Sequence, residues 1–337
     1  METIIEEDLP MQVDCIQWHP TSDEIMAVGA YQLSPTTTDT RIGRLYVIQL
    51  TPNVPGGFSV VLEYETPGGV LDFKFSPYPT PTPHSPTPLA LATSTGLYTF
   101  TLQITPTFTL TPLITMETTA MCLYLQWISP VSLIFSDGDG CINLLDTELT
   151  TETPMHLRKR KKLHEALTWI CHYSNEQDVL YAGCDDGKFN AVKLENLSKE
   201  ELHWVKKFEV GVTSIATRED IVSIGGYDDT LRLYKLSNTP KPTLTPLTSL
   251  NLQGAVWRTF ILPSFHGNAW TFVVSTARKG IKFLEYDLDS KSLSLISEEM
   301  KYEGFLAYGL DVRIEDKRLK IASGYFDNNV IHAFYWG

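Results

Sequence analysis

The sequence of 337 residues lacks the segments and spacings that mark several protein classes. No apolar run approaches the ~20 residues of a membrane-spanning helix. The amino terminus, Met1 to Asp8, is acidic where a signal peptide is basic and then apolar. The five cysteines are odd in number, scattered and without a Cys-x-x-Cys pair, which favours reduced thiols over a disulfide framework or a zinc site. These absences predict a cytoplasmic protein that has no contact with a membrane, with the nucleus as a second compartment.

Basic residues and familiar catalytic signatures are also scarce. The 27 Lys and Arg residues stand against 40 Asp and Glu residues, for a net charge of −13. A nucleic-acid binder usually needs a basic face, so no direct binding to nucleic acid is expected. The sequence contains no Gly-x-Ser-x-Gly elbow, no phosphate loop, no His-Glu-x-x-His and no dinucleotide fingerprint. Any chemistry must therefore come from less specific groups of residues.

What the chain has instead is one β-hairpin pattern that recurs along its whole length. In the copy at residues 221–236, an apolar run leads into a polar turn, Gly225 to Asp229, and an alternating strand follows. The return strands of the seven copies end near Leu50, Leu102, Asp146, Leu194, Leu236, Asp287 and Trp336. The spacings run from 42 residues (194 to 236) to 52 residues (50 to 102). Four-stranded units of ~40–50 residues are typical of WD-repeat propellers. We therefore expect a single all-β domain over residues 1–337, a seven-bladed WD-repeat-type β-propeller.

The end of the chain predicts how the propeller closes. The last unit stops at its third strand because the chain ends at Gly337, and an unpaired sheet edge is a liability. We expect Thr3 to Glu6 to supply the missing outer strand of the last blade.

Two surface loops are expected. The Pro/Thr-rich segment 78–88 should be a mobile loop within a blade, since the strand pattern resumes directly after it; a linker between domains is the competing interpretation. The basic run Arg158 to Lys162 should be a second loop. It could be simply solvated, contact an acidic surface or RNA phosphate, or serve as a nuclear-targeting signal.

Paired aspartates occupy two equivalent hairpin turns, at Asp185-Asp186 and Asp228-Asp229. Such an aspartate could hydrogen-bond the backbone and a neighbouring ring, as in WD-type blades. Alternatively it could act as a general base or attract a cation. Tyr227, beside Asp228, adds a ring that could face a quaternary ammonium group.

Two further groups combine rings with ionisable side chains. His164 lies in an expected loop five residues before Trp169; functional residues concentrate in loops, although a structural histidine is the simpler interpretation. Trp257 and Arg258 begin the sixth unit. The indole could be plain core packing, and the guanidinium could orient a carboxylate or an ester carbonyl.

Together these features resemble one family, the WD-repeat diphthine methyl ester hydrolases of diphthamide biosynthesis, often named diphthine methyltransferases. The family's His-x-x-Glu-x-Trp segment corresponds to His164–Trp169, and its Gly-Gly-Asp-Asp turn corresponds to Gly183–Gly187. Its Gly-Ser-Tyr-Asp turn corresponds to Gly225–Asp228. Its Gly-Gly-Val-Trp-Arg segment corresponds to Gly254–Arg258, and its Tyr-Gly-x-Asp segment corresponds to Tyr308–Asp311. The chain departs from the family pattern at Leu167, Phe208, Ala255 and Glu303, where the family has Glu, His, Gly and His.

The resemblance implies hydrolysis of the methyl ester of methylated diphthine, a modified histidine of elongation factor 2, to diphthine and methanol. It implies a monomer that acts on elongation factor 2 as its protein substrate, with no metal or other cofactor required. The candidate catalytic residues are His164, Asp186, Asp228 and Arg258, and the candidate substrate-binding residues are Trp169, Tyr227, Trp257 and Tyr308. The alternative, from another functional class, is a non-catalytic WD-repeat scaffold for trafficking or ubiquitin-ligase recruitment.

Overall fold

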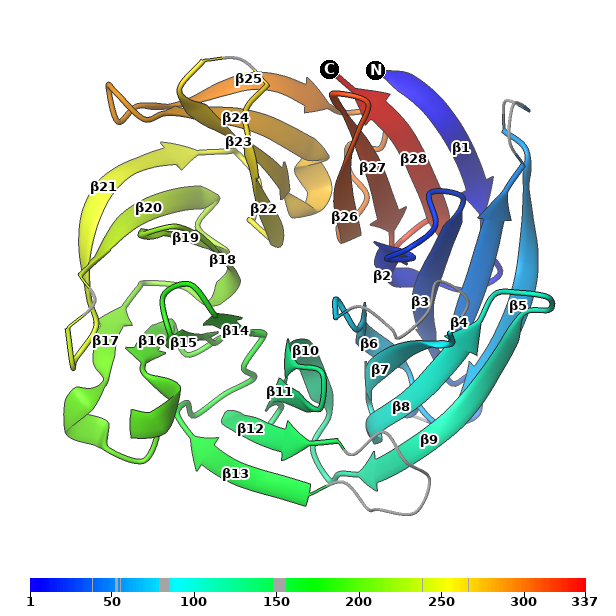
Figure 1. The fold of residues 1–337 in the computed structure, drawn as a ribbon, viewed down its shortest axis with the longest axis horizontal. Helices are drawn as coiled ribbons and strands as arrows, with labels where there is room; N and C mark the ends of the chain where they lie inside the picture. The colour runs from blue at the N-terminus through cyan, green and yellow to red at the C-terminus, as the bar shows by residue number, and fades with distance from the viewer. Residues whose placement is uncertain are drawn as a thin grey trace. The chain divides into compact units, whose positions relative to one another are not determined.

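The computed structural model of the chain is an all-β fold, the seven-bladed β-propeller that the repeat predicts (Figure 1). The structure describes residues 1–37, 39–51, 54, 56–78, 85–147, 156–237, 239–265 and 267–337. In this part of the chain, the strands form seven four-stranded sheets. The described helices are 3-10 turns of three residues each, at Leu194–Asn196, Glu200–Leu202 and Ala277–Lys279. None of the described helices is long and apolar enough to cross a membrane.

The contacts divide the chain into two compact units, which are described separately. The first comprises 1–137, 143–160 and 308–337, and the second comprises 138–142 and 161–307. The first unit contains two complete blades near its start. One has strands β2 (Val13–Trp18), β3 (Ile25–Leu33), β4 (Arg41–Leu50) and β5 (Phe58–Thr66). The other has strands β6 (Val70–Phe75), β7 (Thr87–Thr93), β8 (Gly96–Gln103) and β9 (Thr109–Glu117). The next blade has strands β10 (Cys122–Ser129), β11 (Ser132–Asp137), β12 (Cys141–Asp146) and β13 (His156–Lys162).

The second unit holds three blades in chain order. The first has β14 (Ile170–Ser174), β15 (Val179–Gly183), β16 (Lys188–Val192) and β17 (Trp204–Lys207). The next has β18 (Val212–Arg218), β19 (Ile221–Gly226), β20 (Thr230–Ser237) and β21 (Thr243–Asn251). The third has β22 (Arg258–Pro263), β23 (Ala269–Ser275), β24 (Ile281–Asp287) and β25 (Leu293–Glu299).

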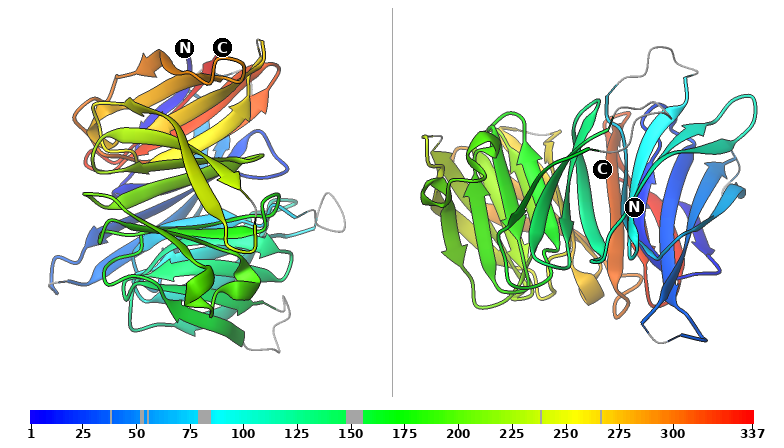
Figure 2. Two further views of the ribbon diagram at one scale, coloured as in Figure 1. Left: turned by 90° about the vertical axis from the view of Figure 1, so that its left-hand side faces the viewer. Right: turned by 90° about the horizontal axis from the view of Figure 1, so that it is seen from below.

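The last blade is completed by the amino-terminal strand, as expected. Strands β26 (Ala307–Glu315), β27 (Arg318–Tyr325) and β28 (Val330–Trp336) are followed in the sheet by β1 (Glu2–Asp8). Strand β1 runs antiparallel to β28, from Glu2 opposite Tyr335 to Asp8 opposite Val330. The two termini therefore lie side by side (Figures 1 and 2). Ile5 is 1% exposed and belongs to the same apolar cluster as Ile331, so this closure buries core surface as well as pairing an edge.

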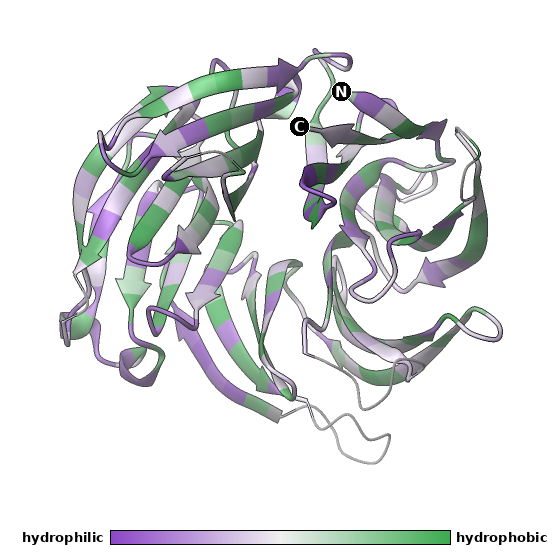
Figure 3. Cartoon of the chain, turned by 45° about the horizontal axis from the view of Figure 1, so that its top comes forward, coloured by the Kyte–Doolittle hydropathy of each residue, from purple (hydrophilic) through white to green (hydrophobic). Residues whose placement is uncertain are grey.

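The burial of the strands follows their position in the blade. The second strands β11, β15 and β19 are buried along their whole length, which explains why they appear in the sequence as short, nearly continuous apolar runs. The outer strands β9, β21 and β25 are mostly exposed or half-buried, with single buried residues in β21 and at the ends of β25. Apolar and polar stretches accordingly alternate along many strands in Figure 3.

Side-chain acceptors that are buried or half-buried connect the first strands of neighbouring blades in the first unit. The Asp311 carboxylate accepts the backbone N–H of Trp18 at 2.7 Å, and the Gln17 side chain accepts that of Phe75 at 2.8 Å. The Asp72 carboxylate accepts the N–H of Leu125 at 3.1 Å. These bonds satisfy backbone donors between the blades.

The expectation of a loop at the basic run is wrong. Residues 158–162 lie in β13, the outer strand of their blade, where charged side chains protect a sheet edge from pairing with another chain. Four of the five basic side chains form ion pairs with carboxylates: Arg158 with Asp146, Arg160 with Asp137, Lys161 with Glu200 and Lys162 with Glu165. The interpretation as a contact for RNA phosphate or an acidic surface is weakened, because most of this charge is already compensated.

The predicted Pro/Thr-rich loop at 78–88 falls partly outside the described residues, which omit 79–84. Its last two residues, Thr87 and Pro88, are the first two residues of strand β7 rather than loop.

Candidate functional site

The second unit brings together side chains that are far apart in the sequence. Trp169 comes directly before β14, and Asp185 lies in the turn between β15 and β16. Tyr227 lies in the turn between β19 and β20, and Trp257 directly precedes Arg258, the first residue of β22. Each blade thus contributes residues from a strand end or a turn. Functional residues often lie at such positions, where a rigid scaffold holds them.

The carboxylate of Asp185 links Trp169 to Tyr227. The indole N–H of Trp169 donates to Asp185 Oδ1 at 2.6 Å, and Tyr227 also hydrogen-bonds this carboxylate. Partial burial raises the pKa of Asp185 above its ordinary value, although the two hydrogen bonds oppose the rise. The result is a solvent-accessible carboxylate of raised basicity, held in place by two aromatic side chains.

Two tryptophans and an arginine extend this group. The rings of Trp169 and Trp257 are 5.5 Å apart and tilted by 59°. The guanidinium of Arg258 lies 5.2 Å from the centre of the Trp257 ring and donates to the Trp257 carbonyl at 3.0 Å. Trp257 is buried, whereas Tyr227 is 42% exposed. The group therefore combines a buried indole ring, a solvent-accessible phenol ring, the Asp185 carboxylate and the guanidinium of Arg258.

Gly211 allows the close approach of Asp185 and Tyr227. A Cβ atom on Gly211 would lie 3.0 Å from Asp185 Oδ1 and 3.0 Å from Tyr227 Cδ2. The Gly211 carbonyl also accepts the backbone N–H of Tyr227 at 3.1 Å. Only a residue without a side chain fits here without displacing a neighbour. Neither Asp185 nor Gly211 was among the site residues predicted from the sequence, although the paired aspartates were a signal for the first.

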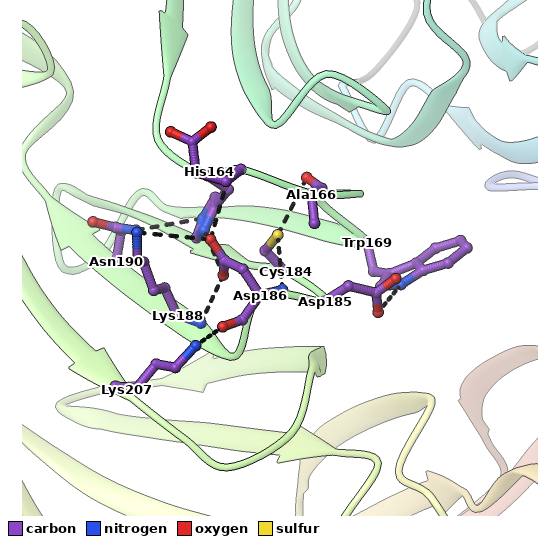
Figure 4. A network of polar contacts seen from close by, with 10 residues as sticks. His164, Ala166, Trp169, Cys184, Asp185, Asp186, Lys188, Asn190 and Lys207 are labelled. Atoms are coloured by element: carbon purple, nitrogen blue, oxygen red, sulfur yellow. Dashed lines mark hydrogen bonds and ion pairs between the residues drawn. The ribbon is translucent and has the colours of Figure 1, made fainter.

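His164 and Asp186 form a partly buried network on the other side of the same turn (Figure 4). His164 is 1% exposed; its Nδ1 lies 3.3 Å from Asp186 Oδ1 and its Nε2 lies 3.4 Å from Asn190 Nδ2. Asp186 also accepts the backbone N–H groups of Lys188 at 2.8 Å and Glu165 at 3.2 Å. Both ring nitrogens of His164 thus have protein partners, as in the structural interpretation that the sequence left open.

Protonation in this network follows from its burial. Burial lowers the pKa of His164, and the neighbouring Asp186 only partly opposes this, so the imidazole is neutral at pH 7. Burial also raises the pKa of Cys184 to about 11. His164, Cys184 and Asp186 have possible ligand atoms within 4.8 Å of one another. The Cys184 thiol is protonated at pH 7 and donates to the Ala166 carbonyl at 3.2 Å, so binding of a metal ion to this trio would have to release the thiol proton.

The remaining predicted residues have other neighbours. Asp228 forms an ion pair with Arg232 of its own hairpin and accepts the N–H of Thr230 at 3.3 Å. Tyr308 belongs to the first unit, where its ring lies 5.5 Å from that of Phe326. The catalytic role of Asp228 and the substrate-binding role of Tyr308 stay predictions.

Comparison with known proteins adds an independent observation. The chain is 29% identical over 220 residues to the diphthine methyltransferase homolog of Dictyostelium discoideum, a match that covers 59% of this chain and 57% of the relative. It is 23% identical over 294 residues to human diphthine methyltransferase, with 77% and 63% covered. The chain resembles the diphthine methyltransferases. This confirms the resemblance inferred from the sequence motifs.

The matches to the diphthine methyltransferases are partial. A third relative, the diphthine methyltransferase of Schizosaccharomyces pombe, is 26% identical over 199 residues, with 57% of each chain covered. The chain therefore spans about three fifths of the length of the curated relatives it matches. No family model matches the sequence.

Solved structures agree on the fold. Sqt1 from Chaetomium thermophilum superposes with a TM-score of 0.70 at 14% identity, covering 100% of this chain and 99% of that one. A chain of the mitotic checkpoint complex superposes with a TM-score of 0.71 at 13% identity, covering 99% and 94%. At such low identity the likeness supports the propeller fold alone.

Proposed function

We propose that this protein belongs to the diphthine methyl ester hydrolases and removes the methyl ester of methylated diphthine on elongation factor 2. The products are diphthine and methanol. The resemblance to diphthine methyltransferases supports a role in diphthamide biosynthesis. Beyond that role, we propose the specific reaction, ester hydrolysis, and the specific substrate, elongation factor 2.

The aromatic group of the second unit suits the cation of this substrate. Methylated diphthine carries a trimethylammonium group, which has no N–H to donate and is recognised through ring faces and nearby negative charge. Trp169, Trp257 and Tyr227 supply rings, and Asp185 supplies the charge. Arg258 is a fixed guanidinium suited to the ester carbonyl and to the oxyanion that develops on it.

Asp185 is the best placed of the candidate bases. In the proposed reaction its carboxylate takes a proton from water as the water oxygen attacks the ester carbonyl carbon. The tetrahedral intermediate then collapses, the bond to the methoxy oxygen breaks, and the proton passes from Asp185 to that oxygen to release methanol. Arg258 stabilises the negative charge on the former carbonyl oxygen throughout. Asp186 and His164 act as positioning residues, because they hold the turn that carries Asp185.

The observation that carries this proposal is the Asp185 carboxylate held by Trp169 and Tyr227 beside Trp257 and Arg258. The test is methanol release from elongation factor 2 that carries methylated diphthine. We expect Asp185→Asn to lower kcat by about 10²–10⁴-fold, the usual contribution of a positioned base. The control is Glu201→Gln, an exposed carboxylate in the connection between β16 and β17 of the same blade. Wild-type rates in both Asp185→Asn and Arg258→Ala would rule out this site.

The names of the relatives favour a second reaction, methyl transfer to diphthine. The same experiment separates the two. Mass spectrometry of the substrate protein would show loss of a methyl group in hydrolysis and gain of one, dependent on a methyl donor, in transfer. No change in either assay would favour the non-catalytic scaffold.

A further inference from the structure

A cavity in the first unit has no part in the proposed reaction. Its volume is about 290 Å³, and it lies where the segment Met116 to Ala120 passes from β9 to β10. The other lining residues come from the blade β10–β13: Phe135, Asp137, Asn143, Leu157 and Arg160. Small-molecule pockets begin at roughly 300 Å³. The cavity can therefore accept a small molecule or one long side chain.

The polar floor of the cavity is buried and fixed. Asp137 is 3% exposed and Asn143 is 2% exposed. The Asn143 amide donates to Asp137 Oδ2 at 3.0 Å, and the Arg160 guanidinium lies 3.3 Å from the same oxygen. Burying a carboxylate is costly unless it is paired, and this pair satisfies that need.

A second carboxylate at the rim has no such compensation. Glu117, the last residue of β9, is exposed and makes no ion pair within the described part of the chain. The lining therefore carries two carboxylates, Glu117 and Asp137, against one guanidinium, Arg160. This excess of negative charge favours a cationic ligand.

The walls are preformed and partly apolar. Thr118 donates its backbone N–H to the Thr95 carbonyl at 3.0 Å and its hydroxyl to the Ala120 carbonyl at 2.6 Å, which fixes the rim segment. Met116 and Leu157 supply apolar surface that can pack against an alkyl stem. A site that is already ordered avoids much of the entropic cost of binding.

In the next hairpin along the chain, a side chain occupies the space that corresponds to this cavity. Asn143 is the third residue after the positive-φ Gly140, and Asn190 is the third after the positive-φ Gly187. Asn190 contacts the His164 ring at 3.4 Å, whereas Asn143 contacts Asp137 and borders the cavity. The His164 ring thus lies beside Asn190 in that blade, whereas Asn143 borders open space.

We propose that this cavity binds an organic cation with N–H donors, an alkylammonium or guanidinium group. The cation can be a free small molecule or the tip of a lysine or arginine side chain of a protein partner. Glu117 and Asp137 accept N–H groups, while the lining ring, Phe135, is only 1% exposed and presents little aromatic face. A quaternary ammonium group, which has no N–H to donate, should therefore bind more weakly here, in contrast to the site in the second unit.

The test follows the Met116 methyl group by NMR of protein labelled at its methionine methyl groups. Agmatine represents the free guanidinium and Nα-acetyl-arginine amide the side chain. The neutral Nα-acetyl-citrulline amide and tetramethylammonium are the controls. We expect the Met116 signal to shift saturably with one or both guanidinium probes at a Kd of ~1 mM or below, and not with the controls. The signal of Met26, fully buried in another blade, is the internal reference.

Variants connect the shift to the proposed charges. Glu117→Gln should weaken guanidinium binding by about fivefold, as expected for one exposed charge, and Asp137→Asn should weaken it further. Glu201→Gln, in another blade, should leave the Kd unchanged. Because Glu117 is exposed, its variant remains informative even if Asp137→Asn unfolds. Equal binding of the citrulline derivative, no shift with either guanidinium probe, or an unchanged Kd in Glu117→Gln would overturn the proposal.

Discussion

The indole N–H of Trp169 donates to the carboxylate of Asp185 at 2.6 Å, although the two residues lie on different segments of their blade. Trp169 also packs against Trp257 of another blade, and Asp185 hydrogen-bonds Tyr227 of a third. The hydrogen bond between Trp169 and Asp185 therefore connects the aromatic rings of the candidate site with the carboxylate proposed as its general base. Asp186, the next residue in the chain, instead supports the turn through His164 and the backbone.

Removal of this hydrogen bond should change the pH dependence of catalysis. The bond to Trp169 lowers the pKa of Asp185 and partly offsets the rise caused by burial. Trp169→Phe keeps a ring but loses the donor, so the carboxyl should hold its proton to higher pH. We expect the acid limb of the kcat/KM profile to move upward by roughly one to two pH units, the equivalent of one hydrogen bond to a charged acceptor. Trp204→Phe, which alters a tryptophan outside the group, should leave the limb in place; an unmoved limb in Trp169→Phe would count against Asp185 as the base.

Gly211→Ala should separate Asp185 from Tyr227. The new Cβ would lie 3.0 Å from atoms of both residues, so one or both must move by a few tenths of an ångström. We expect a destabilisation of about 1 kcal/mol, at the low end for overpacking, and a loss of kcat of about tenfold or more, because catalysis depends on precise placement. The comparison is Gly267→Ala, where φ is +69° and the Cβ meets no atom within 4 Å. It should cost similar stability with no loss of activity, and equal activity losses in the two variants would contradict the specific role of Gly211.

Asp311 should make stability depend on pH. Burial raises its pKa to about 6, although the N–H of Trp18 and the charge of Arg313 oppose the rise. The unfolded value is about 3.9, so between these values the folded state binds more protons than the unfolded state. The stabilisation that protonated Asp311 gives to the folded state is fully present below about pH 4. It decreases as the pH rises through about 6, and the total loss in the free energy of unfolding is up to about 3 kcal/mol.

Asp311→Asn keeps an acceptor for Trp18 and removes the titration. The stability of wild type relative to this variant should fall between pH 4 and pH 7, as measured by urea unfolding at several pH values. The exposed Asp316→Asn in the following turn is the control. Parallel pH profiles for wild type and Asp311→Asn would refute the assignment.

The closing strand should contribute strongly to stability. Ile5→Ala removes buried methyl groups from the cluster that contains Ile331, and should cost about 2–5 kcal/mol in the free energy of unfolding. Ile42→Ala is the matched control, because Ile42 is 39% exposed at the start of β4, and surface substitutions usually change stability by at most about 0.5 kcal/mol. Urea midpoints measure both. Similar losses in the two variants would mean that β1 adds little to the last blade.

Part of the candidate site could be predicted from the sequence. The turn residues Asp185 and Asp186 are visible there as a pair, and the motifs around Trp169, Tyr227 and Trp257 mark these rings as candidates. The sequence could not show which of the two aspartates faces the tryptophan, because adjacent residues of a tight turn point in different directions set by local backbone angles. His164 illustrates the same limit: its position in an expected loop left a functional and a structural role open, and only the structure shows that the side chain is buried.

The sequence by itself determined the number of blades and their closure. Hydrophobic periodicity and turn residues are local signals, and an unpaired sheet edge favours a partner strand, for which the amino-terminal segment was available. Tertiary structure alone decided the rest. It made the basic run an edge strand, since backbone pairing with β12 does not depend on side-chain charge. It also placed Gly211 beneath Asp185 and left a cavity beside Asp137, because close approach and empty space arise only when distant segments pack together.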